Sequence, residues 1–119
     1  MTHTLAVTGG RDYEDRDCVF RWLDARLEWA RQQGKQVRLV VGDAGGADAH
    51  AREWACLRHV DFVEKIARWD LYGNPAGPMR NKEIIDERPD ELIAFPGGSG
   101  TRNCVAQARR RGVRVVEAR

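Results

Sequence analysis

Three glycine-rich turns, at residues 9–10, 42–46 and 97–100, constrain the fold of this chain more than any other feature. Each turn follows a short apolar run with the composition of a buried strand, and each precedes a segment with apolar residues at helical spacing. A chain that alternates strand, turn and helix in units of about 30 residues folds as right-handed β-α-β crossovers around a parallel sheet.

The alternation predicts five strands and about four helices. Strands are expected at residues 5–8, 37–41, 60–66, 91–95 and 113–116. Helices are expected between Asp15 and Gly34 and at residues 47–58, 79–87 and 99–111, with residues 67–78 forming a long loop. We therefore expect an α/β fold with a single domain over residues 1–119, a small Rossmann-like three-layer sandwich with a five-stranded, mainly parallel sheet. In such sheets ligands bind outside the carboxyl ends of the strands, where the three turns should converge.

The turn at residues 97–100 has the features of a phosphate cradle. Gly97, Gly98 and Gly100 lack a Cβ, so the backbone can approach a ligand closely. The first turn of the next helix presents free N–H groups to an anion, and Thr101 adds a hydroxyl donor. The alternative is a plain strand-to-helix turn, for which one glycine is often enough. The spacing matches neither the dinucleotide fingerprint nor the P-loop.

Composition and charge exclude several classes of protein. The chain has 119 residues, 42% of them apolar and 32% charged, and a net charge of +2. That charge is too small to indicate nucleic acid as a partner, and the arginines at residues 109–111 fit the negative end of a helix. Three widely spaced cysteines form neither a disulfide framework nor a zinc pattern. With no signal peptide and no apolar run of about 20 residues, we expect a cytoplasmic protein without membrane contact.

Five motifs together resemble the SLOG superfamily, and more narrowly its YspA/cpYpsA-related group, a domain of unknown function. They are Gly-Gly-Arg-Asp-Tyr at 9–13, Gly-Asp-Ala-Gly-Gly-Ala-Asp at 42–48, Trp-Asp-Leu-Tyr-Gly at 69–73, Ala-Gly-Pro-Met-Arg-Asn at 76–81 and Phe-Pro-Gly-Gly-Ser-Gly-Thr at 95–101. The superfamily includes the LOG phosphoribohydrolases and the DNA-processing protein DprA. The resemblance implies strand order 3-2-1-4-5, a nucleotide or nucleotide-derived ligand, and a homodimer or larger homo-oligomer.

The resemblance to LOG enzymes covers only part of their catalytic residues. Their motif Pro-Gly-Gly-x-Gly-Thr-x-Glu-Glu corresponds here to a segment with Asn103 and Cys104 at the glutamate positions. Their upstream arginine corresponds to Arg80. Asparagine cannot supply the negative charge that stabilises an oxocarbenium-like transition state. Whether the chain is an enzyme therefore stays open.

Asp43, Asp48 and Arg80 are the candidate catalytic residues. Asp43 follows a strand directly and is expected at the pocket mouth, where it could bind ribose, activate water or hold Mg²⁺ against a phosphate. Asp48 either caps the helix over residues 47–58 or contacts the ligand. No metal site is predicted, and Mg²⁺ accompanying a bound nucleotide is the only cofactor considered.

The remaining candidates would bind the ligand. Arg11 and Arg80 are candidate phosphate clamps, because a guanidinium fork matches phosphate. Asn81 would contact base or ribose or brace a loop, and Trp69 would stack on a base or pack in a subunit interface. The predicted nucleotide-binding set comprises Gly9, Gly10, Arg11, Gly42, Asp43, Gly46, Trp69, Arg80, Asn81, Gly97, Gly98, Gly100 and Thr101.

Three functions follow from these features. The first is a nucleotide-binding domain that acts as a sensor without turnover. The second is a LOG-like hydrolase that cleaves the N-glycosidic bond of a nucleoside monophosphate, with Asp43 or Asp48 replacing the missing glutamates. The third is a DprA-like nucleic-acid binder, which the small net charge disfavours.

Overall fold

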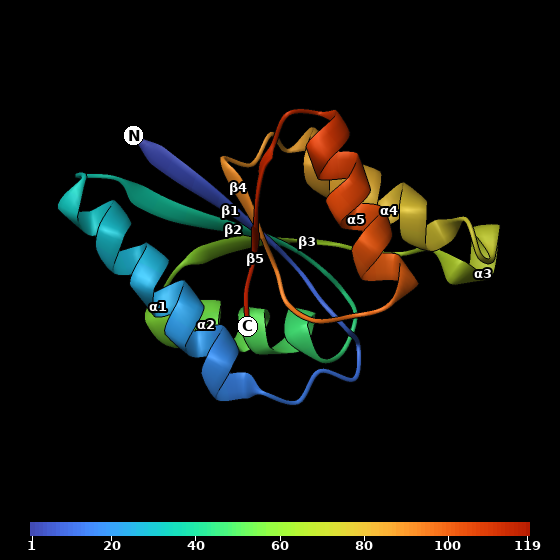
Figure 1. Cartoon of the computed structure of the whole chain (residues 1–119), viewed down its shortest axis with the longest axis horizontal. Helices are drawn as coiled ribbons and strands as arrows, with labels where there is room; N and C mark the ends of the chain where they lie inside the picture. Colours follow the sequence, from blue (N-terminus) through green and yellow to red (C-terminus); the bar gives the residue numbers. More distant parts are fainter.

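The computed structural model describes residues 1–119 and contains one parallel sheet between two layers of helices (Figure 1). The elements are β1 (Thr2–Thr8), α1 (Arg16–Gln32), β2 (Gln36–Gly42), α2 (Ala47–Arg58), β3 (Asp61–Lys65), α3 (Trp69–Tyr72), α4 (Ala76–Asp86), β4 (Glu91–Ala94), α5 (Ser99–Arg110) and β5 (Arg114–Glu117). The strand order is β3-β2-β1-β4-β5, and every neighbouring pair is parallel. The predicted α/β fold class and strand order are confirmed.

Alternating side chains of the strands build the two halves of the core. Leu5 and Val7 of β1 pack in the larger half with α1 and α2, where Trp54 is completely buried. Ala6 of β1 points to the opposite face and packs with α4 and α5 around Ile84. Figure 1 shows the same arrangement, with α1 and α2 on one side of the sheet and α4 and α5 on the other. Both faces of the sheet are therefore covered, as the uniformly apolar strands predict.

The ends of α1 are fixed by the residues that the sequence indicates. Asp15 caps its start, because the carboxylate accepts a hydrogen bond of 3.0 Å from the N–H of Cys18. Gly34 follows its end with φ +70°, a left-handed conformation that glycine adopts without steric cost. The predicted boundaries of α1 are confirmed.

The prediction of an unbroken loop over residues 67–78 is wrong. It contains the short helix α3, and α4 begins at Ala76 rather than at residue 79. Pro75 is the residue before α4 and Pro78 lies in its first turn. Both prolines are compatible with a helix start, since the first N–H groups of a helix have no partner within it. Of the three cysteines, Cys18 and Cys104 are buried and Cys56 is exposed.

A buried ion cluster lies at the amino ends of β1 and β4, opposite the glycine turns. Glu91 begins β4 and is 1% exposed. Its Oε2 atom lies 2.7 Å from Nη2 and 3.0 Å from Nε of Arg26, and 2.6 Å from Nε2 of His3. The rings of His3 and Trp29 meet edge to face with centroids 5.0 Å apart, and the Arg26 guanidinium lies over Trp29. This cluster joins α1 to the sheet.

None of the helices is long and apolar enough to cross a membrane.

Candidate functional site

The three glycine turns meet at the carboxyl ends of β1, β2 and β4. The N–H of Gly10 donates a hydrogen bond of 2.9 Å to the carbonyl of Pro96, which joins the first turn to the third. The carbonyl of Gly10 accepts one of 3.1 Å from the N–H of Ala47, which joins the first turn to the second. The convergence predicted from the strand pattern is therefore present, and the first turn holds the other two together.

Several predicted ligand-binding glycines are instead required by this contact between turns. A Cβ on Gly9 would lie 2.5 Å from the Cβ of Ala47. A Cβ on Gly46 would overlap the carbonyl of Gly10, and Gly46 also has φ +60°. A Cβ on Gly97 would overlap the Thr101 hydroxyl and lie 2.6 Å from the Gly10 nitrogen. The close approach of neighbouring residues to these backbone positions is enough to require glycine there.

Gly98 and Gly100 differ from the other turn glycines. A Cβ on either would meet no atom within 4 Å, so the space beside them is open. The N–H groups of Ser99, Gly100 and Thr101, in the first turn of α5, have no acceptor in the structure. In α2 the N–H of Ala47 is bonded to the carbonyl of Gly10. The positive end of α5, where three successive N–H groups lack an acceptor, is available to an anion.

A cavity of about 560 Å³ lies against this helix end. Its walls come from β1, the turns at residues 9–12 and 42–46, α2, α4 and the first turn of α5. The lining residues are Val7, Thr8, Gly9, Arg11, Asp12, Ala44, Asp48, Arg80, Asn81, Ile84, Gly98, Ser99, Gly100 and Thr101. It lies beside the point where β1 and β4 become neighbours, which is the switch point of the sheet and the usual ligand site of this architecture.

Arg80 is held over the end of β2. Its Nη1 atom lies 2.8 Å from Oδ1 of Asp43, which also accepts a hydrogen bond from the N–H of Ala67. A Cβ on Gly42 would lie 2.5 Å from the same Arg80 nitrogen and 2.7 Å from a carboxylate oxygen of Asp48. Gly42 therefore makes room for both side chains. Asp43 does not line the 560 Å³ cavity, because its carboxylate is occupied in orienting Arg80.

Asp12 and Asp48 are the two carboxylates that line the cavity, and Asp48 is the buried one. It is 5% exposed, and its only hydrogen bond is a long one of 3.3 Å from the N–H of Ala44. It does not cap α2. Burial raises the pKa of Asp48 to about 6, although the nearby Arg80 and the Ala44 hydrogen bond act in the opposite direction. The carboxyl therefore changes charge just below neutral pH and keeps acceptor capacity free for a ligand.

Asn81 braces α4 against α5. Its Nδ2 atom donates to the carbonyl of Gly100 and to Oδ1 of Asn103, and its Oδ1 atom accepts from Nε of Arg80. The bracing alternative for Asn81 thus describes its contacts in the structure. Asn103, at a LOG glutamate position, points to this network and does not line the cavity. Burial raises the pKa of the Cys104 thiol to about 11, so Cys104 is a packing residue.

Arg11 and Trp69 form the outer rim of the site. The guanidinium of Arg11 lies over the Trp69 ring, 5.7 Å from its centroid. A hollow of about 210 Å³ opens between them, lined also by Asp43, Ala44, Gly45 and Arg80. The Trp69 ring packs against Gly77 and is 45% exposed. A planar base could stack here once Arg11 moves aside.

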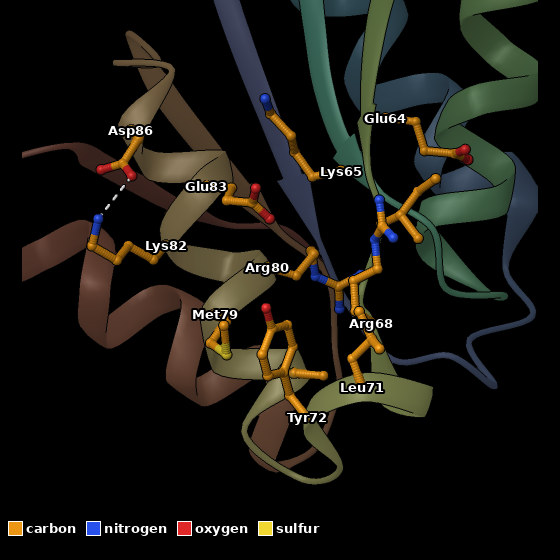
Figure 2. A pocket seen from close by; sticks show the side chains of 12 residues that line it. Glu64, Lys65, Arg68, Leu71, Tyr72, Met79, Arg80, Lys82, Glu83 and Asp86 are labelled. Atoms are coloured by element: carbon orange, nitrogen blue, oxygen red, sulfur yellow. Dashed lines mark hydrogen bonds and ion pairs between the residues drawn. The ribbon is translucent and has the colours of Figure 1, made fainter.

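A second cavity, of about 640 Å³, also borders Arg80 but is otherwise lined by different residues from the 560 Å³ cavity (Figure 2). Figure 2 shows charges of both signs around it, including Arg68 and Glu83, together with the apolar side chains of Leu71, Tyr72 and Met79. All three of these apolar residues are exposed, and α3 buries none of its side chains. This cavity could not be predicted from the sequence, because its residues are spread over β3, α3 and α4. The predicted homo-oligomer stays a prediction.

Thr8, Ser99 and Ile84 line the site but were not predicted as site residues. Thr8 is the last residue of β1 and immediately precedes Gly9, and Ser99 is the first residue of α5. Their positions next to two glycine turns could have indicated that they belong to the site. Ile84 gave no such signal, since it belongs to the apolar stripe that packs α4 on the sheet.

Gly100→Ala is expected to separate binding from stability. Alanine in the first turn of α5 should raise the free energy of unfolding by about 0.5–1 kcal/mol, because glycine is the poorer helix former and the new methyl group meets no atom. The same methyl group would enter the cavity and weaken anion binding. Urea unfolding and calorimetric titration with nucleotides measure the two effects. A stabilised variant with unchanged affinity would place the ligand elsewhere.

The fold and the site place this chain in the class of doubly wound α/β domains that have a glycine-lined cavity at the switch point of the sheet. The chain belongs to the YspA, cpYpsA-related SLOG family, whose model matches residues 4–72. It is 33% identical over 119 residues to the Gene 61 protein of Mycobacterium phage D29, covering 94% of this chain and 93% of the phage protein. The resemblance noted from the motifs is thereby confirmed.

The structure is similar to that of the DNA processing protein A (DprA) from Streptococcus pneumoniae. The TM-score is 0.56 at 15% sequence identity, and the match covers 98% of this chain. The chain spans 59% of the DprA chain. At this level of identity the match shows a shared fold.

Proposed function

We propose that the domain binds a nucleotide or nucleotide-derived ligand in the 560 Å³ cavity. The observation that supports this most strongly is the first turn of α5, where three N–H groups have no acceptor and the space beside Gly98 and Gly100 is open. A phosphate group there would accept these hydrogen bonds, with the Thr101 hydroxyl close by. The family membership and the fold are compatible with a nucleotide-related role.

Arg80 and Asp48 would recognise different parts of the same ligand. Arg80 lines the cavity and is fixed by Asp43, so its remaining donors can meet a phosphate without a large ordering cost. Asp48 has acceptor capacity left after its single hydrogen bond and suits a ribose hydroxyl. Trp69 and Arg11 would enclose the base at the rim. No group of three His, Cys, Asp or Glu side chains lies close enough to hold a metal ion, so Mg²⁺ would enter with the ligand's own phosphates.

Hydrolysis of an N-glycosidic bond is the second candidate, and the pKa of Asp48 favours it. A carboxylate that takes up a proton near pH 6 can remove one from water as the water attacks the anomeric carbon. The carbon–nitrogen bond to the base then breaks, the base takes up a proton from solvent, and Asp48 releases to solvent the proton that it took from the water. Of the two candidate carboxylates, Asp48 suits this role better, because Asp43 is paired with Arg80.

Arg80→Gln is expected to weaken nucleotide binding about tenfold or more, since a hydrogen bond to a charged group contributes about 1.5–3 kcal/mol. The matched control is Lys82→Gln on the same helix, whose side chain is 66% exposed and paired with Asp86. Thermal shift against a nucleotide panel, followed by calorimetry on any ligand that stabilises the protein, measures the effect.

Chromatography of the same samples tests turnover. Stabilisation without base release would support a sensor, and release abolished by Asp48→Asn would support the hydrolase. Equal affinities of the Arg80 and Lys82 variants would contradict the phosphate clamp. The absence of any thermal shift with the panel would contradict the proposed function.

A further inference from the structure

The basic residues of this chain are distributed unevenly. Residues 99–119 carry six arginines and a single acid, Glu117, whereas the whole chain has 20 basic and 18 acidic residues. The small net charge therefore results from an acidic excess in the first 98 residues and a strongly basic last part. In Figure 1 this part of the chain, coloured orange to red, forms α5 and the edge strand β5.

Most of these arginines have no ionic partner. All six are exposed. Arg111 pairs with Asp86 at 2.8 Å, and Arg109 reaches Glu117 only at 3.9 Å, with both side chains more than half exposed. No ion pair involves Arg102, Arg110, Arg114 or Arg119. Because α5 itself contains no acid, the only acid of this part of the chain that approaches its arginines is Glu117 of β5, which also lines the hollow described next. The attraction of the helix end for cations explains the arginines at residues 109–111, but not Arg102 in its first turn.

A hollow of about 650 Å³ lies among these arginines, next to the nucleotide cavity but separate from it. Arg102, Arg109 and Arg119 line it together with Pro96 and Gly97. Arg102 and Arg109 are two helical turns apart, about 10.5 Å along α5, so they lie on the same side of the helix. Thr101 lines both this hollow and the nucleotide cavity, so the two are neighbours at the start of α5.

We infer that the surface formed by α5 and β5 binds the phosphate backbone of a nucleic acid. Spaced guanidinium groups suit a ligand that repeats a phosphate at every unit, because each fork can accept a phosphate in two hydrogen bonds. A membrane fits less well, since the large exposed apolar side chains between Leu57 and Met79 lie outside this surface. The surface has no exposed aromatic ring on which bases could stack, so binding should depend on charge and little on sequence.

Fluorescence anisotropy with a labelled mixed-sequence oligonucleotide, measured over a range of salt concentrations, tests this inference. Arg102→Gln/Arg109→Gln is compared with Arg21→Gln/Arg31→Gln, which removes the same charge from exposed arginines of α1. We expect the first variant to bind more weakly and to flatten the plot of log K against log salt by about 1.4, since each lost phosphate contact removes about 0.7. The α1 variant should keep the wild-type slope.

The other outcomes would overturn the inference. The inference would be wrong if the protein did not bind the oligonucleotide at low salt, or if the slope changed equally in the two variants. It would also be wrong if the protein bound an acidic peptide or polyphosphate in preference to the oligonucleotide. Displacement of the oligonucleotide by a mononucleotide, or its loss in Arg80→Gln, would assign it to the nucleotide cavity instead. Conversely, failure of the nucleotide panel would leave this measurement unaffected, so the two proposals fail separately.

Discussion

Replacement of Glu91 by glutamine is expected to lower the free energy of unfolding by about 3–5 kcal/mol, the largest effect we anticipate for a single substitution. The Glu91 carboxylate binds both Arg26 and His3 at the amino ends of β1 and β4. Glutamine keeps the shape of the side chain but removes its charge, which leaves the half-buried Arg26 guanidinium without a counter-ion. Urea unfolding of wild type and variant measures the loss.

Glu53→Gln provides the control for Glu91. Glu53 also pairs with an arginine, Arg16, but both side chains are more than 40% exposed, so the expected cost is below about 1 kcal/mol. Adding Arg26→Met to Glu91→Gln should recover part of the stability, because it removes the unpaired charge. A loss for Glu91→Gln no greater than that for Glu53→Gln would show that the buried cluster does not stabilise the fold.

Asp48→Asn should stabilise the protein above pH 6 while impairing its site. Burial raises the pKa of Asp48 from 3.8 to about 6, so the folded state retains a proton that the unfolded state has released between these values. Stability conferred by this residue therefore falls as pH rises through that window and stays low above it. A shift of about two units corresponds to roughly 2–3 kcal/mol, which asparagine would restore at neutral pH.

Comparing the pH dependence of the unfolding free energy of wild type with that of Asp48→Asn measures the contribution of Asp48 alone. Unfolding in urea at pH 4 and at pH 7.5 should give nearly equal stabilities for wild type and Asp48→Asn at the lower pH, with the variant more stable at the higher pH. Nucleotide affinity should fall in the same variant, since asparagine lacks the negative charge. Parallel profiles would mean that Asp48 ionises normally. A more stable variant with full affinity would remove Asp48 from the site.

The fold could be predicted from the sequence because three of the five strands, β1, β2 and β4, end in a glycine turn and strands alternate with helices along the chain. Strand order depended on the resemblance of the motifs to a family, since strand patterns do not specify which strands are neighbours. The boundaries near residues 67–87 could not be predicted well. Pro75 and Pro78 were compatible with either a loop or a helix start, and the exposed helix α3 has no apolar periodicity to indicate it.

The site was predicted in outline, but the roles of several residues were not. Gly9 and Gly97 have the same composition signal as Gly98 and Gly100, yet only the structure separates glycines that pack turns from glycines that face open space. The pairing of Arg80 with Asp43, and the burial of Asp48, arise from contacts between α4, β2 and α2. These contacts join residues that are far apart in the sequence. Which of Asp43 and Asp48 lines the cavity could therefore not be predicted from the sequence alone.

The interlocked turns also have an evolutionary consequence. Because Gly9, Gly46 and Gly97 each pack directly against residues of a neighbouring turn or helix start, almost any substitution at these positions would disturb the contact between the turns. New ligand preferences in related proteins should therefore arise mainly at positions outside this contact, at the start of α5, where Gly98 and Gly100 border open space. The rigid floor of the cavity would persist through such changes, while its walls would adapt to different ligands.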